Sequence, residues 1–304
     1  MQAFFYYLSL PFIYLIAILP MPLLYGLSNL FYVLMYYVIG YRKNVVFTNL
    51  KNSFPDKNNN EIHLIAKKFY KYLCDLMLET FKTLVFSKKQ AIRAFEIDAK
   101  TIDMINDYAA KNQSLIFVAG HHGNWEWSGN ALAQQYKGVL YIIYHKLSNK
   151  YFDRFMYNMR SRFGTKLIEM NDVPKAMLKN KNHVSATGFI SDQTPSSVNA
   201  YWLWFLNQPT PVFKGTELLA KKFNYPVIYF SVRRIARGKY KCTGHLLCAE
   251  PKLTADGEIT RLHTKALEDD IKIQPEIWLW SHRRWKHKPD ESILLKLKEN
   301  FVAN

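Results

Sequence analysis

Charged side chains are missing from the start of the chain. No Asp, Glu, Lys or Arg precedes Arg42, and the segment 3–40 is rich in Phe, Tyr, Leu and Ile. A helix needs roughly 20 apolar residues to cross a bilayer, so this segment is long enough for one span, or for two shorter pieces broken near Pro20 and Pro22. It lacks the basic start and small-residue cleavage site of a signal peptide. We therefore expect a membrane anchor over residues 1–41, with two core helices of a soluble fold as the alternative.

Acidic residues and cysteines are scarce as well. The chain has 24 Asp and Glu residues but 41 Lys and Arg residues, and the resulting net charge of +17 favours acidic partners such as membrane lipid, nucleic acid or an acidic carrier protein. The cysteines Cys74, Cys242 and Cys248 cannot all pair, and none has the spacing of a zinc or redox motif. We expect a reduced, cytosol-facing compartment. Arg42 and Lys43 directly follow the apolar segment, which places the remaining body in the cytoplasm.

Residues 42–304 contain no long linker, repeat or low-complexity tract, which indicates one continuous domain. Apolar residues recur at helical spacing over 61–84, with Lys67, Lys68 and Lys71 on the other face, and predict an amphipathic helix. Short apolar runs predict buried parallel strands over 114–120, 139–145, 185–191 and 226–234. Helical stretches lie between them, at 131–136, 151–163 and 215–223. The alternation predicts an α/β fold, a central and mostly parallel sheet flanked by helices, with its chemistry at the carboxyl edge.

The most informative motif follows the first of these strands and reads GHHGNWEW from Gly120. His121 and Glu126 are five residues apart, so they do not share a helix face, and we expect them to meet across the turn. A histidine oriented by a carboxylate is a general base that can take a proton from an attacking alcohol or amine. The alternative is a purely structural turn, in which Asn124 caps a helix and Glu126 favours its dipole. Adjacent histidines rarely bind one ion, so we expect no metal here.

The motif resembles the HX4E motif of the bacterial lipid A late acyltransferases, the lauroyl and myristoyl transferases of the lysophospholipid acyltransferase superfamily. Several other stretches are similar to that family, in the same order along nearly the whole chain: YRKNVVFTNLKNSFPDKNNNEI, SRFGTKLIE, SDQTPSS, GTELLAKKFNYPVIYF and WLWSHRRWKHKP. An ordered set of this kind is far more specific than the short motif alone.

The resemblance implies a monotopic acyltransferase on the cytoplasmic face of the cell inner membrane, without a cofactor. A fatty acyl chain would pass from acyl carrier protein, or from coenzyme A, to a hydroxyl of a lipid A precursor. His121 would be the general base and Glu126 its partner. Arg160, in the Arg-x3-Gly position, would bind substrate or the oxyanion, and Asp192 and Gln193 match the Asp-Gln pair of the family. One departure concerns the acceptor, because this chain has Tyr144 and His145 where many members read tyrosine-arginine.

Other interpretations remain open at this point. A nucleic-acid binder would use the positive charge, but no such signature is present, and we expect no nucleic-acid partner. A non-catalytic membrane scaffold would leave His121 and Glu126 as turn residues. Within the acyltransferases, an aminolipid or a lysophospholipid is the rival acceptor. Arg160 on a solvated helix face and Asp192 as a helix cap are the structural alternatives for those two residues.

Overall fold

A computed structural model describes residues 2–196 and 200–302. The helices are α1 (Gln2–Ile18), α2 (Met21–Val33), α3 (Lys43–Ser53), α4 (Asn59–Lys82), α5 (Lys88–Ala94), α6 (Ala99–Ala110), α7 (Trp125–Leu132), α8 (Lys150–Arg160), α9 (Val173–Lys179), α10 (Gly215–Phe223), α11 (Glu258–Ile273) and α12 (Glu291–Val302). The strands are β1 (Phe95–Ile97), β2 (Leu115–Ala119), β3 (Val139–Tyr144), β4 (Lys166–Glu169), β5 (Ser185–Ile190), β6 (Tyr201–Phe205), β7 (Gln208–Val212), β8 (Val227–Ala236) and β9 (Lys239–Cys248).

A seven-stranded sheet in the order β1-β9-β8-β2-β5-β3-β4 forms the centre of the molecule. All neighbouring pairs are parallel except β8 and β9, which form an antiparallel hairpin. The predicted α/β class with a mostly parallel sheet is therefore confirmed. The predicted helix over 131–136 is confirmed only in part, because the observed helix α7 begins earlier, at Trp125, and ends at Leu132 in a short turn.

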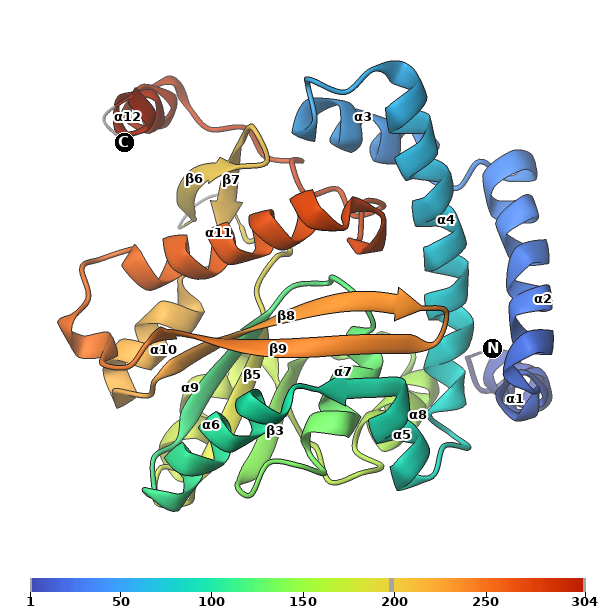
Figure 1. The fold of residues 1–304 in the computed structure, drawn as a ribbon, viewed down its shortest axis with the longest axis horizontal. Coiled ribbons are helices and arrows are strands. Elements are labelled where there is room, and N and C mark those ends of the chain that lie inside the picture. Colours follow the sequence, from blue (N-terminus) through green and yellow to red (C-terminus); the bar gives the residue numbers. More distant parts are fainter. Residues whose placement is uncertain (1, 197–199, 303–304) are drawn as a thin grey trace.

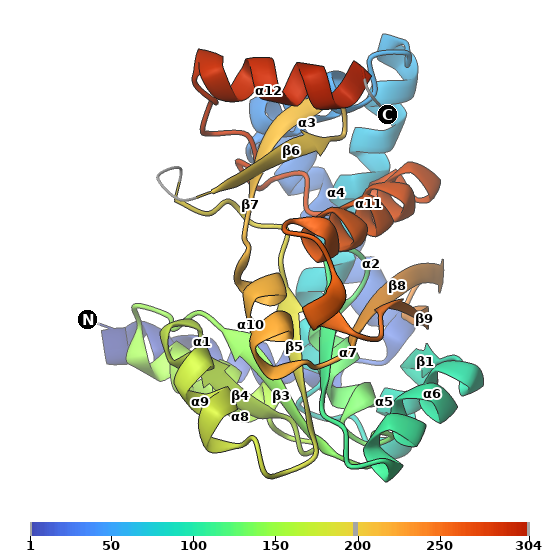
Figure 2. The ribbon, with the colours of Figure 1, turned by 90° about the vertical axis from the view of Figure 1, so that its left-hand side faces the viewer.

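Helices cover both faces of the sheet (Figure 1). Helices α5, α6 and α7 pack against one face, and α10 and α11 against the other. The smaller β6–β7 hairpin and α12 lie beyond α11, away from β3 and β4 (Figure 2). The strands β2 and β5 are thus central, and four of the five side chains of β2 are buried. Such strands read as near-continuous apolar runs because neither face meets water.

Helix α4 is the longest helix, and it begins with a complete capping box between Asn58 and Glu61. The side chain of Asn58 accepts hydrogen bonds from the first turn, and the Glu61 carboxylate accepts one from the Asn58 backbone. Its predicted apolar stripe is buried, whereas Lys67, Lys68 and Lys71 are exposed. The helix therefore presents one face to the core and one lysine-rich face to solvent.

The apolar N-terminal segment forms two helices, α1 and α2, separated at Pro20. Figure 1 looks along α1, while α2 runs beside α4, so the two apolar helices lie at a steep angle to one another. The stretch Met21–Val38 is long and apolar enough to cross a membrane by length and composition. Its outward side chains, among them Leu23, Leu30 and Val38, are mostly exposed.

Candidate active site

The strand register of β2 and β5 brings His121 and Asp192 together. Ala119 pairs with Ile190 at the ends of these parallel neighbours, and each candidate lies two residues past its strand end. Because parallel strands end at the same edge, two side chains 71 positions apart in sequence meet there. The carboxyl edge of the sheet is thus the place where the candidate chemistry gathers, as the sequence predicts.

His121 and Asp192 form a short hydrogen bond. Nδ1 of His121 lies 2.6 Å from Oδ1 of Asp192. Since an ionised carboxylate only accepts hydrogen bonds, Nδ1 carries a proton. The Gln193 amide nitrogen, which can only donate, lies 3.4 Å from the other ring nitrogen, Nε2, which therefore accepts with its lone pair. The ring is therefore held in the tautomer that a general base needs.

Asp192 is held by three donors although it is almost completely buried. Its Oδ2 accepts from the backbone N–H of His121 at 2.7 Å and from Nε1 of Trp278 at 2.8 Å. Burial opposes its ionisation, but the adjacent His121 and these hydrogen bonds outweigh burial and hold the pKa of Asp192 well below its usual range. A buried carboxylate with this many donors stays ionised and stabilises an imidazolium beside it.

The expected hydrogen bond between His121 and Glu126 is wrong. Glu126 lies in the first turn of α7, and its carboxylate forms a two-point ion pair with Arg160 at the end of α8, with distances of 2.8 and 2.6 Å. The five-residue spacing carries Glu126 around the turn toward α8, while the neighbouring strand supplies Asp192 to the histidine. Arg160 is therefore fixed by a carboxylate and does not lie on a solvated face. Asn124 caps α7 as the structural alternative predicted.

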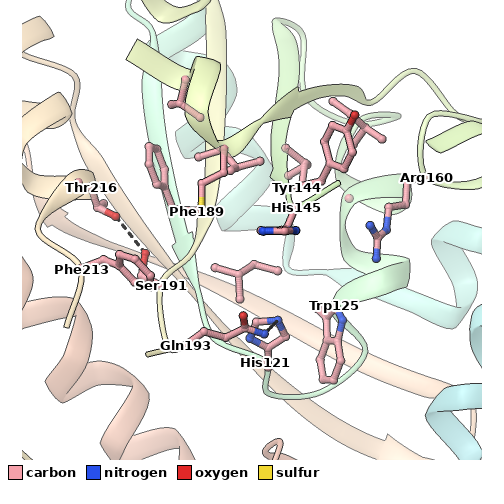
Figure 3. Close-up of a pocket in the computed structure, with 18 of the residues that line it drawn as sticks. His121, Trp125, Tyr144, His145, Arg160, Phe189, Ser191, Gln193, Phe213 and Thr216 are labelled. Carbon is pink, nitrogen blue, oxygen red and sulfur yellow. Dashed lines mark hydrogen bonds between the residues drawn. The ribbon is translucent and has the colours of Figure 1, made fainter. Parts of the chain in front are cut away.

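A cavity of about 440 Å³ opens beside these residues and is lined by His121, Glu126, Arg160 and Gln193. Figure 3 shows His121 and Gln193 next to one another, with Arg160 on another wall. Tyr144 and His145 also line it, and most of the remaining wall is apolar: Ile142, Ile143, Leu147, Leu167, Met170, Val173, Pro174, Phe189, Ile190, Phe213 and Leu219. A long apolar wall with a few convergent polar groups is typical of a site for an amphipathic substrate.

Two glycines of the motif are required by close packing. A Cβ on Gly120 would lie 2.5 Å from Leu267 and 3.2 Å from the Asp192 carboxylate, and Gly123, at a positive φ of 70°, would place a Cβ 2.4 Å from Val232. Side chains at these positions would push the turn away from Asp192 and from the sheet. The glycines thus allow the backbone approach on which the His121–Asp192 contact depends.

Comparison with known proteins covers nearly the whole chain. The sequence profile described as bacterial lipid A biosynthesis acyltransferase matches residues 1–287. The chain belongs to this acyltransferase family. It is 22% identical over 291 residues to the lipid A biosynthesis lauroyltransferase of Escherichia coli (strain K12), covering 93% of this chain and 92% of that protein. It is 23% identical over 283 residues to the lipid A biosynthesis acyltransferase of Haemophilus influenzae, covering 91% and 88%. This lipid A acyltransferase family member is therefore an enzyme of lipid A biosynthesis.

Sequence reasoning missed two aromatic residues of the site in this acyltransferase. Trp278 is buried in the core, and its indole N–H also donates to Asp192. The Trp125 ring packs edge-on against His121, with centroids 4.9 Å apart. Trp125 lies inside the motif and could have been named from it. Trp278 lies 86 positions from Asp192, and no local pattern in the sequence links the two.

Proposed function

We propose that this acyltransferase moves a fatty acyl chain from the thioester of acyl carrier protein to a hydroxyl group of a lipid A precursor, with His121 as general base. The observation that carries the proposal is the 2.6 Å contact between His121 Nδ1 and Asp192 Oδ1 at the edge of a largely apolar cavity. The family and the names of its relatives support the substrate class.

In this mechanism Nε2 of His121 takes the proton of the acceptor hydroxyl as its oxygen attacks the thioester carbonyl. A carbon–oxygen bond forms and an oxyanion develops on the former carbonyl oxygen. Arg160, whose Nε and Nη2 are held by Glu126, or the backbone amides of the turn stabilise that charge. The carbon–sulfur bond then breaks, and the carrier sulfur leaves as a thiol with the proton from His121. Asp192 stabilises the imidazolium between these steps.

The apolar wall of the cavity suits the acyl chain, since each methylene buried there contributes about 0.8 kcal/mol. Gln193 leaves Nε2 of His121 when the acceptor hydroxyl arrives, because both bind the same lone pair. Tyr144 and His145 line the same cavity, and we place the polar part of the acceptor on their side.

Residues 1–41 form the anchor in this proposal, and residues 42–304 form the catalytic body on the cytoplasmic face of the inner membrane. The exposed apolar side chains of α1 and α2 support this assignment. The positive net charge of +17 supports association with anionic lipid and with an acidic carrier.

The decisive test is turnover of purified His121→Ala and Asp192→Asn enzyme with acyl carrier protein thioester and a lipid A precursor. We expect His121→Ala to lose about 10²- to 10⁴-fold in kcat, the range for general base catalysis, while the protein stays folded. His245→Ala, which changes an exposed histidine on β9, is the matched control and should keep its rate. Full turnover of His121→Ala would exclude His121 as the general base, whereas no turnover in the unchanged protein would favour a non-catalytic scaffold.

A second measurement identifies the substrates. The three acceptor classes, a lipid A precursor, a lysophospholipid and an aminolipid, are offered in competition, each with carrier protein and with coenzyme A thioesters. We expect the lipid A precursor and the carrier thioester to be consumed fastest. Faster acylation of a lysophospholipid or an aminolipid would overturn the acceptor while leaving the role of His121 intact. Mass spectrometry of lipids from cells with and without the protein checks the product.

A further inference from the structure

Helix α4 carries two buried carboxylates, Asp75 and Glu79, between the apolar helix α2 and the active-site turn. Both side chains are almost fully buried. Buried charges are costly unless they are well supplied with hydrogen-bond donors, so each such group in a native fold needs an explanation. Neither carboxylate lines the catalytic cavity.

Glu79 joins α2 to the active-site turn. Its Oε1 accepts from the Tyr25 hydroxyl of α2 at 2.9 Å and from the Gly238 N–H at 3.1 Å. Its Oε2 accepts from Nδ2 of Asn124 at 2.9 Å and from the Tyr240 hydroxyl at 2.7 Å. Four donors converge on two oxygens, and this pattern suits a carboxylate and no neutral side chain.

Asn124 transmits this contact to the catalytic groups. While its amide nitrogen donates to Glu79, its amide oxygen caps α7 by accepting from the Trp127 N–H at 3.0 Å. The same first turn carries Trp125 against the His121 ring and Glu126 against Arg160. The start of α7 therefore has its position set from the side of α4.

Two further bonds tie the same turn to α4. The Tyr72 hydroxyl donates to the Gly123 carbonyl at 2.6 Å, and the Trp127 indole donates to the Glu79 carbonyl at 2.9 Å. Of these groups of α4 in the described part of the chain, only the Glu79 carboxylate also forms a hydrogen bond to a side chain of α2. It is the point at which the apolar helix and the active-site turn share one group.

Helix α2 has two chemically different faces. Its inner face meets α4 from Tyr25 at Glu79 to Tyr32 at Lys71, whose ammonium lies 5.3 Å from the Tyr32 ring centroid. Its outer face exposes Leu23, Leu30 and other apolar side chains. A bilayer that covers the apolar outer face would keep the inner face of α2 turned toward α4 and so favour the hydrogen bond between Tyr25 and Glu79.

We propose that Glu79 is a positioning residue that couples the seating of α2 on α4 to the geometry of the active-site turn, so that turnover depends on how firmly α2 is held. The proposal rests on His121 as the base of the proposed function. Activity loss in His121→Ala tests that function separately, and the variants below leave His121 unchanged.

The matched pair for the test is Tyr25→Phe and Ser28→Ala. Both remove one hydroxyl of α2 that donates to a buried carboxylate of α4, since Ser28 donates to Asp75 at 2.6 Å. Of these two carboxylates, only Glu79, the partner of Tyr25, also binds Asn124. We expect Tyr25→Phe to lower kcat by about fivefold, with little change in KM. Ser28→Ala should keep kcat close to the wild-type value, although both variants lower the unfolding temperature.

A double-mutant cycle tests whether the effect passes through Glu79. In Glu79→Gln enzyme, where the four donors no longer find two acceptors, Tyr25→Phe should have no further effect on kcat. If Glu79→Gln does not fold, hydrogen exchange of the amides of residues 125–128 replaces the cycle, and Tyr25→Phe should speed their exchange while Ser28→Ala does not. Equal kcat losses in Tyr25→Phe and Ser28→Ala, or unchanged kcat in both, would overturn the coupling.

Discussion

Glu126 and Arg160 form a two-point ion pair that joins the first turn of α7 to the last turn of α8 on the wall of the catalytic cavity. The carboxylate of the HX4E motif therefore orients a cation and does not touch the histidine. Burial opposes the charge of Arg160, yet Glu126 outweighs it and raises the pKa of the guanidinium. The positive charge is thus permanent and fixed in direction, as oxyanion or phosphate binding requires.

Replacement of Arg160 by Lys tests this role. Lysine keeps the charge but cannot form the two-point contact with Glu126, so we expect kcat/KM to fall roughly 10- to 100-fold. Steady-state kinetics of Arg160→Lys and Glu126→Gln check it, and the two losses should be similar. A loss in Glu126→Gln as large as that in His121→Ala, with normal activity in Asp192→Asn, would instead restore the His121–Glu126 pairing.

The folded protein should lose stability as the pH falls from about 6.5 toward 4. His263 is buried, and burial lowers its pKa from 6.5 to about 4; burial lowers that of His122 to about 4 as well. Between these pH values the two histidines are protonated in the unfolded chain but neutral in the folded protein. The free energy of unfolding therefore falls by roughly 1 kcal/mol for each histidine per unit decrease in pH. Above pH 6.5 both states are neutral at these positions and the effect ends.

The variant His263→Gln checks that prediction by urea unfolding at several pH values. In His263→Gln the free energy of unfolding should depend less steeply on pH, by the contribution of one proton. The variant His183→Gln, at an exposed position, should keep the wild-type pH dependence. An unchanged slope in His263→Gln would mean that this ring is protonated in the folded state.

Gly129 lies in α7 on the cavity wall, where a Cβ would meet Ile142 at an ordinary 3.6 Å. We expect Gly129→Ala to fold and to gain about 0.5–1 kcal/mol, since alanine restricts the unfolded chain and favours the helix. Gly129→Leu should fill part of the cavity and shift the preference toward shorter acyl donors by roughly tenfold. Competition between donors of two lengths measures it, and an unchanged ratio in Gly129→Leu would place the acyl chain elsewhere.

Lys82 holds the end of α1. Its ammonium donates to the carbonyls of Ala17 and Leu19, each at 2.7 Å, where a helix C-terminus favours a cation. We expect Lys82→Met to weaken the seating of α1 by about 2–4 kcal/mol, seen as faster proteolysis near residue 19. Lys68→Met, at an exposed position of the same helix, is the control. Equal proteolysis of the two variants would contradict this role for Lys82.

The fold was accessible from the sequence because its signals are local. The apolar runs at β2, β3, β5 and β8 and the amphipathic pattern of α4 each lie within one element, and these elements form where they were predicted. The break of the apolar segment near Pro20 was likewise predictable, since proline ends one helix and starts the next.

The hydrogen-bond partner of His121 could not be predicted from the sequence in the same way. Motif spacing suggests the nearest carboxylate in the chain, Glu126, whereas the contact with Asp192 depends on β5 lying beside β2. Trp278 reaches the same carboxylate from a third segment. Such contacts follow from strand order and long-range packing, which no window of one sequence contains.

The inner surface of α2 has a practical consequence for handling this enzyme. A shortened chain that begins after Gly40 would uncover Asp75, Glu79 and Lys82 together, and each would lose donors or acceptors from α1 or α2. Removing the apolar N-terminal segment to obtain a soluble protein would therefore expose these buried polar groups of α4 to water, directly behind the catalytic turn. In this enzyme α1 and α2 are part of the folded structure that supports the active site.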